Sequence, residues 1–374
     1  MPSTPANPVL SSVARALPQG IRERIRRTVK RNRNGRPVLG IAGFFGAGNY
    51  GDELFLEVYK QYFGEEFELR VLADLHKKPF YSRPVEEIVK EVDAIVIGGG
   101  DILQSWNSDP RYFNHAFLKK PVFVVGIGVP QYKNAKPMSE FAMRKHTTFL
   151  QHPNVKRIGV RDDQAAQWIR KHIQPKREVL VAPDMVCSLN LPEAHKPEGA
   201  PILGIATRQR PNLDEPDDYT RIQELARHAS AKGWRIRHIV LGTMEVGRRD
   251  VANAEDLDVP GKELVYTEDL DELSRSIGEC TAFASMKFHG TVVATMYGVP
   301  SIVMIATNKN VNFMRRIGLD GNLSSFTDPN LVTKFEERTT PAPEDLERIR
   351  KDTDQHMQDL VNHVRHAVRA TANA

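Results

Sequence analysis

Short apolar runs alternate along the chain with glycine-rich turns and longer amphipathic stretches. The run PVLGIAGFF at residues 37–45 is apolar throughout, which is the pattern of a parallel strand buried on both faces. A glycine-rich turn and a helical pattern follow it, and this order recurs. Further strands are expected at residues 67–72, 93–100, 121–129, 155–162 and 179–183, with helices near 84–91, 138–150 and 163–172. The first half of the chain is therefore predicted to form a doubly wound α/β domain.

The pattern stops at residues 192–200 and then restarts. This segment, PEAHKPEGA, is polar and proline-rich, so it is predicted to be a linker. After it, strands are expected at residues 202–208, 235–242, 282–285 and 300–306, with helices at 217–232 and 287–298. We expect five segments: a basic N-terminal arm (1–36), a first Rossmann-like domain (37–191), the linker (192–200), a second Rossmann-like domain (201–342), and a C-terminal helix and tail (343–374).

The composition of the 374 residues is that of a globular protein, with 40% hydrophobic and 26% charged residues. No stretch reaches the roughly 18 consecutive apolar residues that a membrane-spanning helix needs, and the N-terminus has no secretory signal pattern. The two cysteines, Cys187 and Cys280, favour a reducing compartment over a disulfide framework. We therefore expect a cytoplasmic enzyme.

Positive charge is concentrated at the N-terminus. Residues 1–36 contain nine basic side chains and one acidic one, so the arm carries +8; because the total is +5, the rest of the chain carries −3. An acidic body gives no reason to expect a nucleic-acid partner. Ile21, Ile25 and Val29 fall at helical spacing within the arm. Two interpretations stay open: a solvated extension, and an amphipathic basic helix in peripheral contact with an anionic membrane, at its inner face.

The turn after the first strand, GAGNYGDE at residues 46–53, combines glycines with polar residues at the start of a helix. Glycines there let backbone N–H groups approach a ligand, and a helix N-terminus favours an anion. Asn49 and Gly51 are thus candidate ligand contacts. Asp52 either caps the helix or contacts the ligand, where it would act as a base. The spacing of the glycines differs from the dinucleotide-binding fingerprint.

Two other strand ends of the first domain carry candidate residues. Gly99 and Gly100 close the strand at 93–100, where they either leave the backbone open to a ligand or permit a tight turn. Arg161 ends a later strand. Its planar guanidinium either binds a carboxylate or phosphate, or pairs with Asp162 or Asp184.

The second half of the chain places basic side chains at the carboxyl ends of its predicted strands. These residues are Arg208, Lys287, His289 and Lys309. Together with Arg161, they predict a cleft between the domains that binds a small, strongly anionic substrate. The sequence contains no P-loop, Gly-x-Ser-x-Gly, His-Glu-x-x-His or cysteine-pair motif, so neither a metal nor a cofactor is expected.

The glycine turns and basic strand ends form one ordered set. Its members are Gly48-Asn49-Tyr50-Gly51-Asp52-Glu53, Gly98-Gly99-Gly100, Gly126-Ile127-Gly128, Arg161-Asp162, Ser285-Met286-Lys287-Phe288-His289-Gly290 and Gly298-Val299-Pro300. Over residues 40–325 this set resembles the polysaccharide pyruvyltransferase family. The resemblance implies two Rossmann-like domains facing each other across a cleft, in a glycosyltransferase-B-like arrangement. It also implies transfer of pyruvate from phosphoenolpyruvate to a sugar of a polysaccharide or its precursor, as a ketal, with release of phosphate.

The resemblance also assigns roles to residues. The positions that match donor-binding or catalytic groups of the family are Arg161, Arg208, His289 and Lys309. Lys287 stands where the family has arginine, which keeps the charge but not the planar fork. On this basis, His289 is expected to be the general acid–base, and Asp52 to orient or deprotonate the acceptor. The expected partners are phosphoenolpyruvate and a saccharide, either free or linked to a lipid carrier.

Two other functions stay open at this point. A nucleotide-sugar glycosyltransferase would share the architecture and would bind a diphosphate at a helix N-terminus of the second domain, where Lys287-Phe288-His289 lies. A non-catalytic relative that binds glycans or anions would keep the fold without turnover. The joint presence of four residues favours an enzyme over this last function: Asp52, Arg161, His289 and Lys309.

Overall fold

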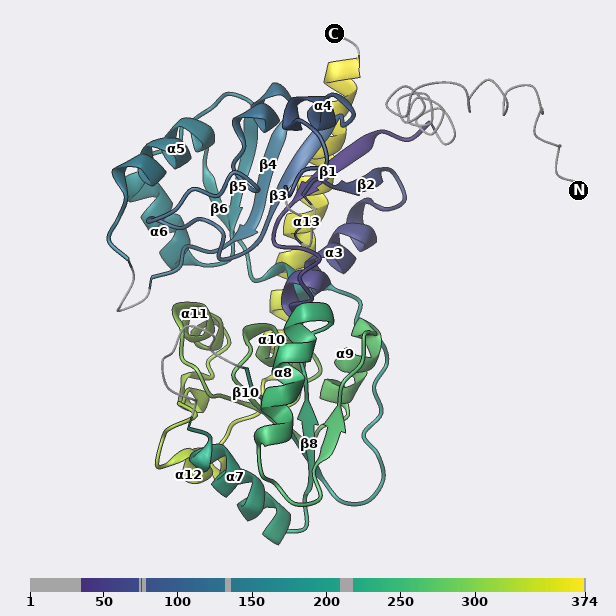
Figure 1. Cartoon of the computed structure of the whole chain (residues 1–374), viewed down its shortest axis with the longest axis vertical. Helices are drawn as coiled ribbons and strands as arrows, with labels where there is room; N and C mark the ends of the chain where they lie inside the picture. The colour runs from purple at the N-terminus through teal and green to yellow at the C-terminus, as the bar shows by residue number, and fades with distance from the viewer. Residues whose placement is uncertain (1–34, 74, 76–78, 132–135, 209–217, 373–374) are drawn as a thin grey trace, which may run out of the picture.

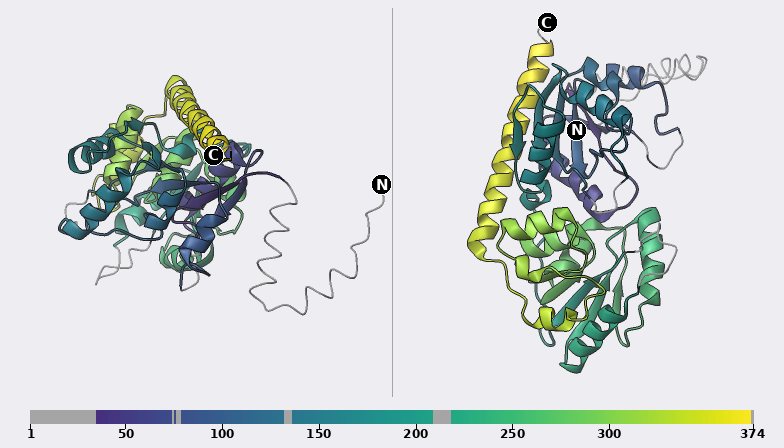
Figure 2. Two further views of the ribbon diagram at one scale, coloured as in Figure 1. Left: turned by 90° about the horizontal axis from the view of Figure 1, so that it is seen from above. Right: turned by 90° about the vertical axis from the view of Figure 1, so that its left-hand side faces the viewer.

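The computed structural model describes residues 35–73, 75, 79–131, 136–208 and 218–372. The basic arm expected at residues 1–36 lies outside this part of the chain except for its last two residues. Two α/β domains follow each other along the long axis of the molecule (Figure 1), and a long C-terminal helix runs beside the first of them (Figure 2).

The first domain is built on a sheet of six strands that pair in parallel. Their spatial order is β2 (Glu68–Val71), β1 (Val38–Ala42), β3 (Ala94–Gly100), β4 (Val122–Ile127), β5 (Val155–Val160) and β6 (Val179–Val181). Strands β1, β3 and β4 are buried along their whole length, as their uninterrupted apolar runs predict. The helical elements are α3 (Tyr50–Phe63), α4 (Val85–Lys90), η1 (His115–Lys119), α5 (Glu140–Leu150), α6 (Asp163–His172) and η2 (Met185–Ser188).

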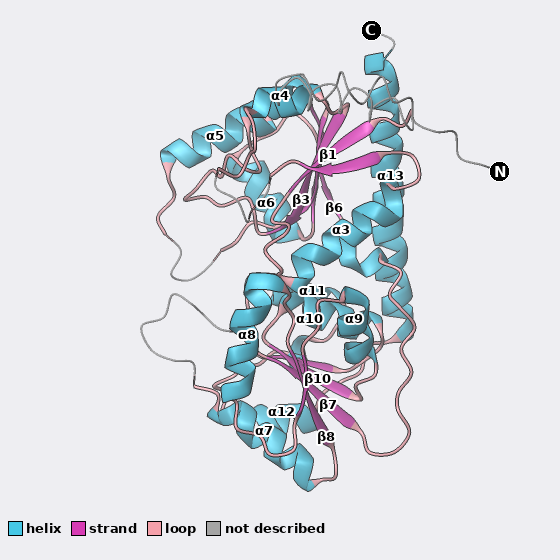
Figure 3. Ribbon diagram, turned by 45° about the vertical axis from the view of Figure 1, so that its right-hand side comes forward, coloured by secondary structure: helices cyan, strands magenta, loops and turns pink. Residues whose placement is uncertain are grey.

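The second domain repeats this plan with a parallel sheet of five strands (Figure 3). Their order is β11 (Ser301–Val303), β10 (Ala282–Ser285), β7 (Ile202–Ala206), β8 (Arg235–Ile239) and β9 (Glu263–Val265). The helices are α7 (Thr220–Ala231), α8 (Met244–Asp256), α9 (Leu270–Gly278), α10 (Phe288–Met296), α11 (Asn308–Arg316), η3 (Asp320–Asn322), α12 (Leu331–Glu336) and α13 (Pro343–Ala372).

One of the buried hydrophobic clusters contains residues of both domains. Phe55 and Tyr59 of α3 belong to the same buried cluster as Phe283 of β10 and Phe288 of α10. Helix α13 leaves the second domain, runs along the first (Figure 2), contacts η2, α3 and β3, and adds Leu360 to this cluster. Because apolar burial is the main stabilising term in folding, this shared core fixes the two domains against each other.

Polar contacts hold the start of α3 against the second domain. The Tyr50 hydroxyl lies 2.6 Å from the Ser274 hydroxyl of α9, and the Thr243 N–H donates to the Gly48 carbonyl at 2.7 Å. Both cysteines are buried free thiols. Within the ranges that the structure describes, every helix is too short or too polar to cross a bilayer.

Candidate active site

The turn between β1 and α3 is folded around the carboxylate of Glu53. Its Oε1 accepts hydrogen bonds from the backbone N–H groups of Gly46 at 2.8 Å and Gly48 at 3.0 Å. Both glycines have a φ of +83°, which residues with a side chain rarely adopt. Glu53 therefore shapes the turn, a role that the sequence analysis did not assign to it.

Asp52 lies in the first turn of α3 and is 9% exposed. Its Oδ2 accepts a hydrogen bond from the side-chain amide of Asn49, and Asn49 itself is the N-cap residue, so Asp52 does not occupy the capping position. Gly100, with a φ of +84°, leaves room for the carboxylate, because a Cβ there would lie 3.2 Å from Oδ1. Burial raises the pKa of Asp52, against the effects of His289 and Lys309. A raised carboxyl pKa suits proton transfer near neutral pH.

His289, at the start of α10, is enclosed by aromatic rings. The ring centroids of Phe55 and Phe288 each lie 4.9 Å from that of His289, in edge contacts. Its Nε2 faces Oδ2 of Asp184 at 3.5 Å and has no hydrogen-bond partner among the described residues. Its Nδ1 lies against Gly51, where an added Cβ would come within 1.6 Å. The ring of this second-domain residue thus sits between two first-domain residues.

Arg161 is enclosed by carboxylates and its side chain is 3% exposed. Its Nη2 donates to Oδ1 of Asp101, and its Nη1 lies 3.8 Å from Oδ2 of Asp184. Oδ2 of Asp101 also lies 3.2 Å from Nζ of Lys309. Of the two roles considered for Arg161, pairing with carboxylates is therefore the one that the geometry shows. Lys309 and Arg161 both lie over the Phe288 ring, with centroid distances of 5.4 and 5.1 Å.

Neighbouring positive charges lower the pKa values of Asp101 and Asp184 by more than burial raises them. Burial acts to raise the pKa of Asp101, but Arg161 and Lys309 hold that pKa below its usual value. Burial acts on Asp184 in the same way, and His289 and Arg161 hold its pKa low as well. Both carboxyl groups are therefore ionised at neutral pH.

Lys287 forms an ion pair, whereas two neighbouring arginines have no acidic partner among the described residues. Its Nζ donates to Oδ2 of Asp250 on α8. Burial lowers the pKa of Lys287 against the effect of Asp250, and the charges of Arg208 and Arg249 lower it further. In the described chain, neither guanidinium group has an acidic partner, and Nε of Arg249 is buried without a hydrogen bond. Two guanidinium charges therefore stay available for an anion.

These side chains surround a cavity of about 320 Å³ between the domains. Its lining residues are Phe44, Asn49, Tyr50, Gly51, Arg208, Leu241, Val246, Arg249, Asp250, Met286, Lys287, Phe288, His289, Gly290, Ile305, Thr307, Lys309 and Asn310. Helices α3, α10 and α11 begin at this cavity, and the structure shows no side-chain hydrogen bond at their N-cap residues. Their free N–H groups and dipoles favour an anion there.

The structure brings most of the predicted site residues together. Those that line the cavity are Asn49, Gly51, Arg208, Lys287, His289 and Lys309. Asp52, Gly100 and Arg161 lie buried directly behind it. Gly99 packs under Phe55, because an added Cβ would come within 2.2 Å of that ring.

Three site residues were not singled out from the sequence, namely Asp101, Arg249 and Asp250, and Asp184 was considered only as a partner of Arg161. For Asp101 and Asp184 the sequence does contain a signal, which is their position at a strand end: Asp101 follows a run of glycines, and Asp184 follows β6. Arg249 lies within a polar helix and had none. Among the residues that the structure describes, no group of three or more His, Cys, Asp or Glu side chains is placed to hold a metal ion.

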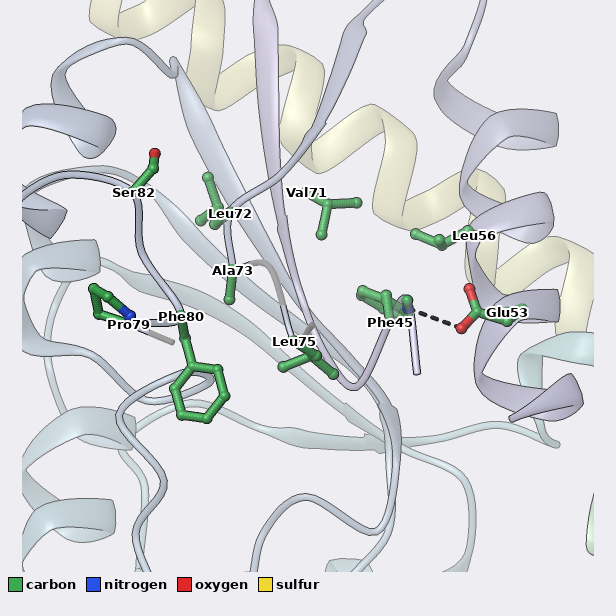
Figure 4. A pocket seen from close by; sticks show the side chains of 11 residues that line it. Phe45, Glu53, Leu56, Val71, Leu72, Ala73, Leu75, Pro79, Phe80 and Ser82 are labelled. Atoms are coloured by element: carbon green, nitrogen blue, oxygen red, sulfur yellow. Dashed lines mark hydrogen bonds between the residues drawn. The ribbon is translucent and has the colours of Figure 1, made fainter. Parts of the chain in front are cut away.

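A second, larger cavity of about 710 Å³ opens in the first domain (Figure 4). Its lining is mostly apolar and consists of Phe45, Gly46, Glu53, Leu56, Val71, Leu72, Ala73, Leu75, Pro79, Phe80 and Ser82. The turn between β1 and α3 separates the two cavities, because Phe44 lines the first and Phe45 the second. In Figure 4, the rings of Phe45 and Phe80 lie on opposite sides of Leu75.

Comparisons with known proteins bear on both fold and family. A family model described as polysaccharide pyruvyl transferase matches residues 49–308. The chain is similar in structure to UDP-N-acetylglucosamine 2-epimerase from Rickettsia bellii, with a TM-score of 0.53 and 12% identity over 91% of this chain and 100% of that one. It is also similar to S. aureus MnaA in a co-structure with UDP, with a TM-score of 0.51 and 12% identity over 84% and 95%. No curated protein matches the chain. The predicted glycosyltransferase-B-like pair of domains is confirmed.

Proposed function

Because its family model covers residues 49–308, the chain belongs to the polysaccharide pyruvyl transferase family and is a transferase, and we propose that phosphoenolpyruvate is its donor. The product would be a pyruvyl ketal on a sugar, with phosphate released. The observation that carries the proposal is the cavity between the domains. There Arg208 and Arg249 have no acidic partner among the described residues, and three helices without side-chain caps begin. A carboxylate and a phosphate on three carbons would satisfy these groups.

The reaction balances without a further reagent. C3 of the enol gains a proton, and two sugar hydroxyl oxygens form bonds to C2. The bond between C2 and the bridging oxygen breaks, so phosphate departs with that oxygen. Of the two hydroxyl protons, one replaces the proton given to C3 and the other leaves with phosphate or to solvent. The site must therefore bind two anionic groups, move protons and hold two hydroxyls.

Different side chains of the site would bind the donor and transfer the protons. Arg208, Arg249 and Lys309 hold the carboxylate and the phosphate and stabilise the charge that develops as phosphate departs. His289, at the edge of the same cavity, donates and accepts protons. Asp52, with its raised pKa, receives the acceptor proton from the side of the first domain. The volume of about 320 Å³ suits a small donor, since ligand sites commonly measure about 300–1,000 Å³.

The apolar cavity of the first domain supports an acceptor on that side of the turn. The aromatic ring of Phe80 in this lining would pack against the C–H face of a sugar ring. The guanidinium of Arg111 lies over the Phe80 ring, 4.4 Å from its centroid, and so holds this ring in place. Phe80→Ala should therefore raise the KM for the acceptor and leave the KM for phosphoenolpyruvate unchanged. Phe141→Ala is the matched control, because Phe141 is 59% exposed on α5.

A lipid-linked acceptor would require the protein at a membrane surface, and the basic arm is the segment we propose for that contact. Each surface cation contributes at most about 1 kcal/mol, and the attraction falls off within about 8 Å at physiological salt. Binding should therefore be reversible and removed by salt. Deleting residues 1–34 should abolish co-sedimentation with anionic vesicles while preserving activity on a soluble glycoside. Equal sedimentation of both proteins would contradict this role.

The donor is tested with phosphoenolpyruvate labelled with ¹⁸O at the bridging oxygen. Incubation with a panel of glycosides should release labelled phosphate and no free pyruvate, and His289→Gln should abolish the release. A contaminating phosphatase would leave the label in pyruvate instead. UDP-N-acetylglucosamine serves as the rival donor, because the S. aureus relative was solved with UDP. Release of UDP, together with no phosphate from phosphoenolpyruvate, would overturn the proposal in favour of a nucleotide-sugar enzyme.

A further inference from the structure

Two carboxylates of the first domain reach across to second-domain groups that the proposed reaction uses. Oδ2 of Asp184, just before η2, lies 3.5 Å from Nε2 of His289. Oδ2 of Asp101, just after β3, lies 3.2 Å from Nζ of Lys309. Each contact joins a carboxylate of the first domain to a side chain of the second. The packing of the two domains therefore sets the positions of His289 and Lys309 relative to these carboxylates.

The buried guanidinium of Arg161 lies near both carboxylates, Asp101 and Asp184. Its Nη2 donates to Asp101, its Nη1 lies 3.8 Å from Asp184, and its side chain is almost fully buried. Gly128 makes this possible, because a Cβ there would lie 2.4 Å from Oδ1 of Asp101 and 2.5 Å from Nη2 of Arg161. The guanidinium is thus hydrogen-bonded to Asp101 and attracts Asp184 by charge alone, because neither Nη1 nor Oδ2 of Asp184 has a hydrogen-bond partner among the described residues.

The contact with Asp184 decides which ring nitrogen of His289 carries a proton. Burial acts to raise the pKa of Asp184, but His289 and Arg161 hold it low, so the carboxylate is ionised. An ionised carboxylate only accepts hydrogen bonds. At 3.5 Å this carboxylate attracts a proton on the nitrogen that faces it, so it favours the neutral tautomer with the proton on Nε2 and the lone pair on Nδ1.

Nδ1 lies on the side of the ring where the proposed chemistry occurs. It packs against Gly51 in the first turn of α3, in the space that a Cβ would take. Gly51 lines the cavity of about 320 Å³, next in sequence to Asp52. Nε2, in contrast, is buried against Asp184.

We propose that Asp184 is a positioning residue that holds His289 with Nε2–H toward the first domain, so that Nδ1 is the nitrogen that transfers protons in the cavity. Arg161 and Asp101 complete this device by holding Asp184 and Lys309. The inference rests on the proposed function for the identity of the reaction. The ring orientation that it requires, however, is a property of the protein without any substrate.

Long-range ¹H–¹⁵N NMR of the histidine rings tests that orientation on the unmodified protein. The resonances that disappear in His289→Gln identify His289 among the 12 histidines. At a pH where the ring is neutral, we expect the proton on Nε2, and we expect a mixture of the two tautomers in Asp184→Asn. A ring of the unmodified protein with its proton on Nδ1, or already a mixture, would overturn the proposal. This measurement stands even if Asp184→Asn fails to fold.

Kinetics separate positioning from a general structural role. Asp184→Asn should lower kcat by roughly 10²-fold and change the KM for phosphoenolpyruvate by less than about threefold. Asp162→Asn is the matched control, because Asp162 caps α6 through the Ala165 N–H at 2.7 Å and asparagine caps equally well. A raised KM with unchanged kcat in Asp184→Asn would contradict the proposal. Absence of turnover with phosphoenolpyruvate in the unmodified protein would instead refute the proposed function, and the NMR result would then decide this inference alone.

Discussion

The contact between Gly51 and His289 provides the sharpest test of the site. An alanine Cβ at position 51 would lie 1.6 Å from Nδ1 of His289, whereas an ordinary contact begins at 3.4 Å. The ring would have to move by the difference, 1.8 Å. Phe55 and Phe288 pack against it at centroid distances of 4.9 Å and oppose the movement. Because a displacement of about 1 Å at a reacting group can lower the rate about 10²-fold, Gly51→Ala should lower kcat at least that much.

The same clash can be isolated in the free energy of unfolding. Alanine favours a helix over glycine by about 1 kcal/mol, and overpacking of a core costs about 1–3 kcal/mol. Gly51→Ala should therefore destabilise the otherwise unmodified protein or leave its stability nearly unchanged. In a His289→Gly background all three clashing atoms, Nδ1, Cγ and the Cβ at 2.6 Å, are gone, so the same substitution should stabilise the protein by about 1 kcal/mol. This change of sign is the signature of the contact.

Urea unfolding of the four proteins of this double-mutant cycle gives the coupling energy, and steady-state kinetics of Gly51→Ala gives kcat. Gly321→Ala is the control, because Gly321 is exposed and an added Cβ there would meet no atom within 4 Å. The reasoning fails if Gly51→Ala folds normally and keeps kcat within threefold of the original value. It fails equally if the coupling with His289 is zero.

Three further predictions concern charge. Asp52→Asn should raise the free energy of unfolding at pH 7 while lowering turnover, because burial raises the pKa of Asp52 above 3.8 and its ionisation penalises the folded state. This gain should disappear in urea melts below pH 3.8, where the carboxyl is protonated in both states. Arg249→Ala should weaken phosphoenolpyruvate binding about 10–150-fold in calorimetry, the equivalent of about 1.5–3 kcal/mol, whereas Arg248→Ala, at an exposed position of the same helix, should not. Finally, stability should fall between pH 7 and pH 5, because burial lowers the pKa of His238 to about 3 and the unfolded chain takes up the proton near 6.5. This loss is worth about 2 kcal/mol at pH 5 and continues toward pH 3, and a His238→Gln protein with an unchanged pH profile would contradict it.

Several strands follow from local pattern, because β1, β3 and β4 are uninterrupted apolar runs, whereas β5 and β8 are largely buried although charged residues interrupt them. The run at 121–129 and the short run at 282–285 both became central strands. The stretch between β8 and β10 was not predicted as structured. There α8 is polar along most of its length, and β9 is three residues long with two exposed positions. Such elements depend on packing against their neighbours, which local periodicity does not report.

The candidate site was predictable as far as it depends on topology. Carboxyl ends of parallel strands lie on one edge of a sheet, so Arg208, Lys287 and Lys309 were expected to converge, and they do. Pairing was not predictable, because it depends on side chains far apart in sequence. Asp101 and Lys309 are 208 positions apart and belong to different domains.

Nearby carboxylates reduce the repulsion among the basic side chains of the cavity before the donor binds. Arg208, Arg249, Lys287 and Lys309 line one cavity of about 320 Å³, and four like charges at that spacing would repel one another. Asp250 offsets Lys287, and Asp101 offsets Lys309. Since Asp101 belongs to the first domain, part of this compensation exists only when the domains are in contact. The two arginines without acidic partners in the described chain then present a net charge that a dianionic donor neutralises on binding.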